Sequence, residues 1–373
     1  MNKVSDPVFS PEGGHFTHSQ VVTINCATEG AQIYYTLDGR VPSVYEELYT
    51  EPLSVELGTH VKAIAVKAGM GNSNVASANY LSTPPCLFSS CDIPNYAHSL
   101  ALKDDFVYVA SGYTGLVVVN INNLERPQVI GSCNTPGSAN SVAISGNYAY
   151  VSDGNSGLQI VNISNPASLV ITGSLDIDSH AYGIAVSGNY AYLGGGWRLL
   201  VVNISNPENP VIAGSCITPD FDYAKKVAVS GNHAYVTNGD YGLQVIDISN
   251  PANPHIVSTC GIMDNAVDVA VSDNYAYVTS LYDGIHVIDI SNPINPTVSG
   301  VCLLGRLSGI VVNGNFAYAT GNWGLYVVDI SNSTNPVPIG GCFTPASAYD
   351  VAIRNNYAFV AANESGLQII ELD

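Results

Sequence analysis

The sequence predicts an all-β protein in which a seven-bladed β-propeller follows a small immunoglobulin- or fibronectin-like β-sandwich. Three observations favour this fold. An apolar motif recurs every 41 to 43 residues, the length of one four-stranded propeller blade. No stretch has helical periodicity, and abundant Gly, Pro, Asn and Ser suit short strands joined by tight turns. The end of one repeat also precedes the first whole copy, as expected for a closed ring.

Residues 1–80 lack this repeat and are predicted to form the sandwich. They contain short runs of alternating polarity, VVTINCA, AQIYYTLDG, LSVELG, VKAIAVKAG and VASANY, which are typical of a small antiparallel sandwich. Residues 81–84 form a short proline-containing linker, and residues 85–373 form the predicted propeller.

Each repeat unit divides into four predicted strands. An inner strand of the type SVAIS (141–145) is followed by a two-residue Gly-Asn, Asn-Asn, Asp-Asn or Asp-Asp turn, by YAYV, and by GLQVIDIS. A corner of the type NPANP interrupts the ladder, and PVIAGSC supplies the fourth strand. The seven units are marked by Tyr108, Tyr150, Tyr192, Tyr235, Tyr277, Tyr318 and Phe359.

The last unit stops after its third strand, at Asp373. Residues 85–91, PCLFSSC, match the missing fourth strand and precede the first whole unit. Adding them to unit seven completes its sheet and removes an exposed edge. We therefore expect Phe88 to pair with residues 366–371.

The strings GLQIVNISNP, LLVVNISNPENP and GLQVIDISNPANP resemble LVIVD repeats, and the resemblance covers all seven units. It implies a propeller from a bacterial or archaeal surface or secreted protein, and the family has no shared enzymatic activity. The runs VFSPEGGHF, AQIYYTLDGRVPS and VKAIAVKAGM resemble the C-terminal domain of chitobiases and β-hexosaminidases. That likeness implies an accessory module.

Composition argues against several classes of function. The net charge is −19 with 11 Lys and Arg, so no broad basic surface can form and nucleic-acid binding is not expected. No run of 18 apolar residues exists, so membrane insertion is not expected either. The start, MNKVSDPVFSPEGG, has no apolar signal region. The chain is then cytoplasmic or a mature fragment, and the family resemblances favour an extracellular or cell-surface location.

Six of the eight cysteines occupy one equivalent position in successive units. Equivalent points on neighbouring blades are too far apart for disulfides, so these side chains are expected to be small buried groups. A bridge between Cys26 and Cys86 remains open. No metal or other cofactor is expected, because the HFTH histidines (His15, His18) precede a strand in a loop and SDGNSG and NGDYG lack a calcium-binding ligand run.

The variable residues concentrate in the loops between the second and third strands and between successive units, which share one face of a propeller. Five of these loops carry an aromatic residue, at Tyr113, Trp197, Tyr241, Tyr282 and Trp323. Four basic residues map to the same face, at Arg198, Lys225, Lys226 and Arg306. Two alternatives stay open: the aromatics cover the ends of blade cores, and the lysines pair with Asp220, Asp222 and Asp268.

We therefore expect a non-enzymatic binding or adhesion platform for a glycan or a surface protein. One alternative is a polysaccharide hydrolase or lyase, in which Tyr182, Lys225, Tyr349 and Asp350 would support acid–base chemistry. Another is a structural spacer without a ligand.

Overall fold

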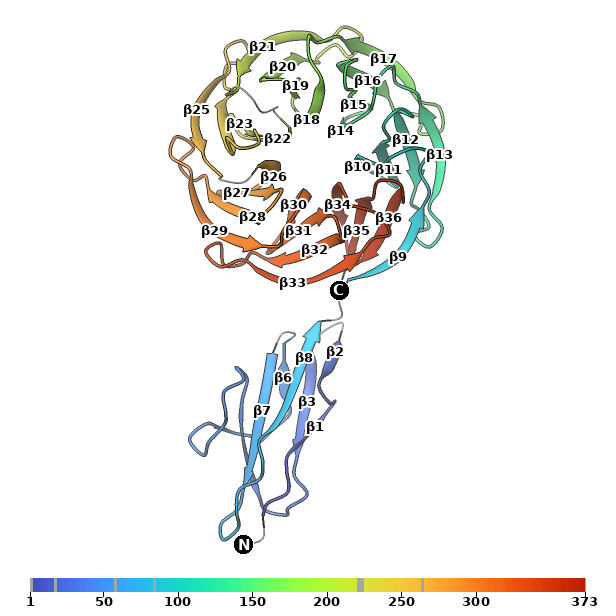
Figure 1. The fold of residues 1–373 in the computed structure, drawn as a ribbon. Helices are drawn as coiled ribbons and strands as arrows, with labels where there is room; N and C mark the ends of the chain where they lie inside the picture. Colours follow the sequence, from blue (N-terminus) through green and yellow to red (C-terminus); the bar gives the residue numbers. More distant parts are fainter. Residues whose placement is uncertain are drawn as a thin grey trace. The chain divides into compact units, whose positions relative to one another are not determined.

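The computed structural model describes residues 3–16, 19–56, 59–82, 85–219, 225–262 and 265–372. The chain divides into two compact units at Pro84 and Pro85. All regular elements in the described ranges are strands (Figure 1), which confirms the predicted all-β class. Within these ranges no helix is long and apolar enough to cross a membrane.

The N-terminal unit packs two sheets around one core. The first has the order β1 (Val8–Ser10), β3 (Gln20–Asn25), β6 (Leu53–Val55). The second has the order β2 (Gly14–Phe16), β8 (Ala76–Ser82), β7 (Thr59–Val66), β4 (Gln32–Thr36), β5 (Glu47–Leu48). Alternate residues of β3 and β7 are buried together, as the alternating sequence predicts.

The second unit is a ring of seven four-stranded antiparallel sheets, blades 1 to 7, whose strands a to d run from the axis outward (Figure 1). Blade 1 contains β10 (Ser99–Lys103), β11 (Phe106–Ala110), β12 (Leu116–Asn120) and β13 (Gln128–Cys133). Blade 2 contains β14 (Ser141–Ser145), β15 (Tyr148–Ser152), β16 (Leu158–Asn162) and β17 (Val170–Leu175). Blade 3 contains β18 (Ala181–Ser187), β19 (Tyr190–Gly195), β20 (Arg198–Asn203) and β21 (Val211–Ile217).

Blade 4 contains β22 (Val227–Ser230), β23 (His233–Thr237), β24 (Leu243–Asp247) and β25 (His255–Cys260). Blade 5 contains β26 (Ala266–Ser272), β27 (Tyr275–Ser280), β28 (Gly284–Asp289) and β29 (Thr297–Leu303). Blade 6 contains β30 (Leu307–Asn313), β31 (Phe316–Gly321), β32 (Gly324–Asp329) and β33 (Val337–Phe343). Blade 7 contains β34 (Asp350–Arg354), β35 (Tyr357–Ala361), β36 (Leu367–Glu371) and β9 (Cys86–Cys91).

Strand β9 comes from the start of the unit and lies beside β36 at its end (Figure 1). Cys91 is opposite Leu367 and Cys86 is opposite Glu371, with a register shift after Ile369. Strand β9 thus pairs with β36, but the expected pairing of Phe88 itself is wrong, because the shift leaves this residue in the bulge. Its ring packs edge-on against Tyr357, with the ring centroids 5.3 Å apart. The same shift between strands c and d occurs in every blade, so β9 reproduces a native blade edge.

The turn between strands a and b requires a left-handed backbone at its first residue in every blade. This requirement explains why only Gly, Asn and Asp occupy the position. The residues concerned are Asp104, Gly146, Gly188, Gly231, Asp273, Gly314 and Asn355.

The hydrophobic core lies between neighbouring blades. Tyr108 and Val118 of blade 1, for example, pack in one cluster with Val151 and Val161 of blade 2. Five of the six repeated cysteines are buried, and Cys133 is half-buried. All eight cysteines are free thiols in the structure.

The glycine two residues before the cysteine position in strand d has a packing role. A side chain at Gly131 or Gly173 would overlap the carbonyl oxygen of Pro166 or Pro207, in the corner of the next blade. Close approach of the two backbones therefore requires glycine at these positions.

Candidate functional site at the loop face of the propeller

The loop face is defined here by the b–c loops and the d–a connections, which lie at the same end of the strands. At this end, seven equivalent positions at or near the start of the inner strands form a ring around the axis, termed the inner ring. The inner-ring residues are Ser99, Ser141, Gly183, Lys226, Asp268, Gly309 and Asp350.

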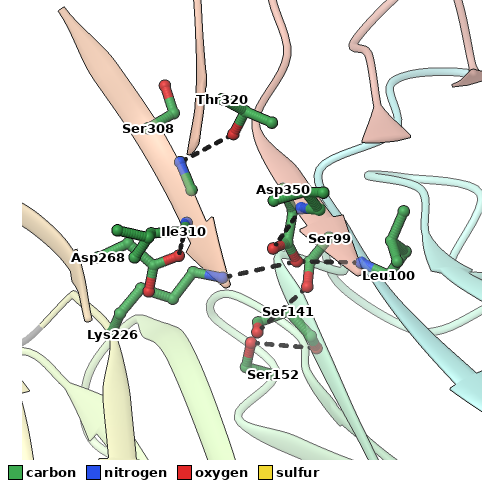
Figure 2. Close-up of polar contacts among 12 residues, drawn as sticks. Ser99, Leu100, Ser141, Ser152, Lys226, Asp268, Ser308, Ile310, Thr320 and Asp350 are labelled. Atoms are coloured by element: carbon green, nitrogen blue, oxygen red, sulfur yellow. Dashed lines mark hydrogen bonds and ion pairs between the residues drawn. The ribbon is translucent and has the colours of Figure 1, made fainter. Parts of the chain in front are cut away.

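Side chains of the inner ring tie blades together (Figure 2). Ser99 Oγ lies 3.5 Å from Ser141 Oγ, which joins blades 1 and 2. Asp268 accepts a hydrogen bond from the Ile310 backbone N–H of blade 6 at 3.2 Å. Asp350 accepts one from the Leu100 backbone N–H of blade 1 at 3.1 Å. These carboxylates therefore satisfy backbone donors across blade junctions.

The two inner-ring glycines act differently, by letting blades approach closely. A Cβ at Gly183 would overlap the Lys225 carbonyl oxygen of blade 4, and one at Gly309 would overlap the Tyr349 carbonyl oxygen of blade 7. Bridging side chains and close-approach glycines therefore both serve packing in the inner ring, and Lys226 is the one inner-ring residue outside these two groups.

Lys226 reaches across the axis from blade 4 to blade 7, where its Nζ lies 3.8 Å from Asp350 Oδ2 (Figure 2). The pair is mostly buried, with side-chain exposures of 26% and 13%. Burial lowers the pKa of Lys226, but the negative charges of Asp350 and Asp268 outweigh it, so the net shift of this pKa is upward. The amine is therefore held as a cation.

Asp268 is buried beside this pair. Burial raises its pKa to about 6, with Lys226 opposing the shift and Asp350 adding to it. Backbone N–H groups of Val269 and Ile310 bond its two oxygens and partly compensate for the lost hydration. The loop face thus contains one buried cation between two carboxylates from different blades.

This arrangement differs from the expected acid–base cluster, in which Lys225 accompanied Asp350. Lys225 Nζ donates instead to Asn265 Oδ1 at 2.5 Å, because successive residues at the start of a strand point in different directions. Of the carboxylates considered as partners for the lysines, Asp268 lies next to Lys226. Asp220 and Asp222 lie outside the described residues.

A second polar group surrounds His180 on blades 2 and 3. Its Nδ1 lies 3.0 Å from Asn155 Oδ1, and its Nε2 lies 3.1 Å from Asn140 Nδ2. Its ring also contacts the Tyr182 ring at 4.6 Å between centroids. Burial lowers the pKa of His180, and these partners suit a neutral ring that donates through Nδ1 and accepts through Nε2.

The carboxylate of the SDGNSG loop, Asp153, is fully buried. It accepts hydrogen bonds from the Thr135 hydroxyl at 2.6 Å and from the Gly137 backbone N–H at 2.8 Å. Burial raises its pKa, while these bonds lower it by less. Asp153 therefore fixes the d–a connection of blade 2. The sequence analysis missed this role, although an acidic residue directly after a buried strand was a usable signal.

Five aromatic residues predicted on the b–c loops lie there. Four of them expose most of their surface: Tyr113 (75%), Trp197 (62%), Tyr282 (72%) and Trp323 (67%), whereas Tyr241 exposes 39%. Side chains exposed to this degree do not cover the ends of blade cores. Such exposure of large aromatics is instead typical of surfaces that contact a ligand or partner.

The four predicted basic residues do not form one cluster in the structure. Lys226 is engaged at the axis, Lys225 bonds Asn265, Arg198 is half-buried in blade 3, and Arg306 is exposed between blades 5 and 6. Among the described residues, no group of three His, Cys, Asp or Glu side chains has the arrangement of a metal site. His15 lies in β2, and His18 lies outside the described residues.

The fold and the repeated inner ring define a seven-bladed propeller built from one repeated motif. Residues 94–135, 136–177, 178–218, 222–261, 264–303, 305–344 and 345–372 match the LVIVD repeat. The chain therefore belongs to the LVIVD-repeat family. Residues 11–77 match the chitobiase/beta-hexosaminidase C-terminal domain, so the second resemblance is confirmed as well.

Similar solved structures support the fold alone. The β-propeller domain of Cps50 (Swd1) from Myceliophteria thermophila is 13% identical, with a TM-score of 0.62, and covers 78% of this chain and 100% of its own. The computationally designed Ika8 protein is 12% identical, with a TM-score of 0.59 and the same coverage. A search of curated proteins found no relative of the chain.

Proposed function

We propose that this protein is a non-enzymatic binding platform of the cell surface or extracellular space, which holds a glycan or a partner protein on the loop face of its propeller. The observation that carries the proposal is the exposure of Tyr113, Trp197, Tyr282 and Trp323 on this one face. Large rigid aromatics supply contact area at a small cost in conformational entropy, so they are favoured as anchors in binding surfaces.

The opposite face supports the proposal by contrast. Its corners repeat one capping arrangement, in which the last residue of strand c accepts a hydrogen bond from a backbone N–H two residues later, as with Asn162 and Ser164, Asp247 and Ser249, and Asp289 and Ser291. That face carries structural repetition, whereas the loop face carries residues that differ from blade to blade. The charged inner-ring residues Lys226, Asp268 and Asp350 interact with one another, which favours binding over acid–base chemistry.

Affinity electrophoresis of the whole chain tests this function. Gels would contain neutral polysaccharides (dextran, xylan) or anionic ones (alginate, polygalacturonate), and the variants Tyr113→Ala, Tyr282→Ala and Trp323→Ala would run beside the wild type. We expect retardation in at least one gel, reduced in one or more of these variants. Phe316→Ala, at a half-exposed aromatic on the opposite face, is the matched control and should migrate like the wild type. Equal migration of the chain in all gels would contradict glycan binding, and equal retardation of every variant would contradict the assigned face.

A further inference from the structure

Blades 3 and 6 each have a short b–c turn of a kind that the other blades lack. Gly195 pairs with Arg198 and Gly321 pairs with Gly324, so each pair encloses a two-residue b–c turn. The second residue of both turns is tryptophan, Trp197 in blade 3 and Trp323 in blade 6, and these are the only tryptophans in the chain. The two side chains therefore occupy equivalent places three blades apart.

The same backbone contact fixes both tryptophans. The Trp197 carbonyl accepts from the Thr218 N–H at 2.7 Å, and the Trp323 carbonyl accepts from the Thr344 N–H at 3.3 Å. In both blades the c–d ladder continues one residue beyond the cysteine position, to Ile217 or Phe343. Each indole is thus presented by a rigid two-strand edge, which suits a preorganised binding surface.

An exposed apolar side chain accompanies each indole. Trp323 and Phe343 meet edge to face, with ring centroids 6.3 Å apart and an interplanar angle of 89°. Ile217 is the equivalent residue of blade 3 and is also exposed. In four other blades the residue after the cysteine position is polar or glycine: Asp92, Asn134, Asp176 and Gly261.

An arginine lies next to each tryptophan turn in an otherwise acidic chain. Arg198 directly follows Trp197. The backbone carbonyl of Arg306 packs against Gly321, beside the turn that carries Trp323. Neither guanidinium forms an ion pair with any residue in the described ranges. With a net charge of −19, an arginine without an acidic partner is available to a ligand's carboxylate, which its planar fork matches.

We propose that the Trp197 edge of blade 3 and the Trp323 edge of blade 6 are two similar subsites, with equivalent tryptophans and arginines from different positions in the blade, for the uronic acid residues of an acidic polysaccharide. In each subsite the sugar ring stacks on the indole, and the sugar carboxylate pairs with the adjacent arginine. This inference rests on the proposed function and names its ligand class. Because both subsites lie on one face, one polymer can engage both, and binding through two sites strengthens the attachment without new contacts.

Titration of the two indole N–H signals in a ¹H–¹⁵N NMR spectrum tests the proposal. The probe is trigalacturonate, and maltotriose is the neutral control. Each Trp→Phe variant removes one signal and assigns the other. We expect both indole signals to move with trigalacturonate at similar dissociation constants, and to move little with maltotriose.

Two arginine variants separate the subsites. Arg198→Gln should weaken the trigalacturonate titration of Trp197 about tenfold and leave that of Trp323 unchanged, and Arg306→Gln should do the reverse. Unchanged signals elsewhere in the spectrum would show that each variant is folded. For polygalacturonate, loss of either subsite should lower the apparent affinity about 100-fold, because only one attachment remains.

The contrary outcomes separate this inference from the proposed function. Equal shifts with both trisaccharides, or no effect of the arginine variants, would overturn the uronic acid assignment. Indole signals that do not move, together with polysaccharide retardation that depends on Tyr113 or Tyr282, would overturn the two subsites and leave the platform intact. Absence of both indole shifts and retardation in every gel would contradict both.

Discussion

Lys226 Nζ of blade 4 lies 3.8 Å from Asp350 Oδ2 of blade 7, so one side chain connects two blades that are not neighbours in the ring. The same carboxylate accepts the Leu100 backbone N–H of blade 1. Asp350 therefore links the lysine to the blade junction that the closing strand β9 completes. This partly buried ion pair therefore adds a contact across the axis to the apolar packing between neighbouring blades.

Lys226→Met should destabilise the propeller by roughly 2 kcal/mol, because it leaves two carboxylates without their shared cation. Asp350→Asn should also be destabilising, and the double variant should cost less than the sum of the single changes by about 1 kcal/mol, since the residues interact directly. Chemical denaturation followed by circular dichroism measures these values. Asp38→Asn removes the shorter but exposed pair between Arg40 and Asp38, at 2.5 Å, and should change little. Additive effects of Lys226→Met and Asp350→Asn would show that the pair is not coupled.

Asp268 predicts a defined dependence of stability on pH. Its pKa is about 6 in the folded protein and 3.8 in the reference state, so the folded state binds the proton more tightly. The stability from this group is present below pH 3.8 and is lost as the pH rises through about 6. Between pH 5 and pH 7.5, the free energy of unfolding of the wild type should therefore fall by about 1 kcal/mol relative to Asp268→Asn. A difference between the two proteins that does not change with pH would contradict the raised pKa.

His180 should titrate below the ordinary histidine pKa of 6.5, and its neutral form should be the Nδ1-protonated tautomer. Asn155 Oδ1 accepts from His180 Nδ1, and Asn140 Nδ2 donates to His180 Nε2. A second proton on the ring would sit on Nε2 and would face the Asn140 N–H donor. Because the pKa of the folded state is lowered, stability from this group is lost as the pH falls through its folded value. Imidazole ¹⁵N chemical shifts measured between pH 5 and 8 report both the tautomer and the pKa. A pKa at or above the ordinary value of 6.5, or the opposite tautomer, would contradict the arrangement.

Thiol reactivity should separate the cysteines by their burial. Cys86 is exposed and Cys26 is half-buried, whereas most cysteines of the repeat are buried and burial raises their pKa, as for Cys260 and Cys302. In the native protein at pH 8, a thiol reagent should modify Cys86 fastest and leave the buried cysteines intact until the chain unfolds. Mass spectrometry of the labelled protein identifies the sites. Rapid labelling of Cys302 before unfolding would show that the blade interiors open.

Much of the fold follows from periodicity, because each repeat must bury one face against the next. The period of Tyr108 and its equivalents predicts the seven blades, and the positive φ of Gly146 and Asp273 explains the restricted turn residues. PCLFSSC could be predicted as a strand of the last sheet because the last unit lacks a fourth strand of its own. The loop pattern also predicted that Trp197 and Trp323 lie in b–c loops, but it left open whether these side chains are exposed.

The axial contact could not be predicted in the same way. The repeat alignment places Lys226 and Asp350 at equivalent positions, and equivalence by itself indicates that they are apart. The contact depends on the length of the lysine side chain and on the width of the ring at its inner strands, and neither quantity is encoded in a pattern. The choice between Lys225 and Lys226 depends on one residue of register. Short-range polarity cannot resolve that choice where the strand begins.

The closing strand β9 provides the last prediction. Phe88 packs against Tyr357 and belongs to the core between blades 7 and 1, so it connects the two ends of the unit. Phe88→Ala should lower the free energy of unfolding by about 2 kcal/mol, below the cost for a fully buried phenylalanine because Phe88 is only half-buried. All blades should still unfold in one transition at a lower denaturant concentration, since an opened ring exposes two blade faces together. Ser90→Ala, on the same strand at an exposed position, is the matched control and should leave the midpoint unchanged. An unaltered midpoint for Phe88→Ala, or a separate early transition of blade 7 alone, would contradict a ring that depends on this strand for its stability.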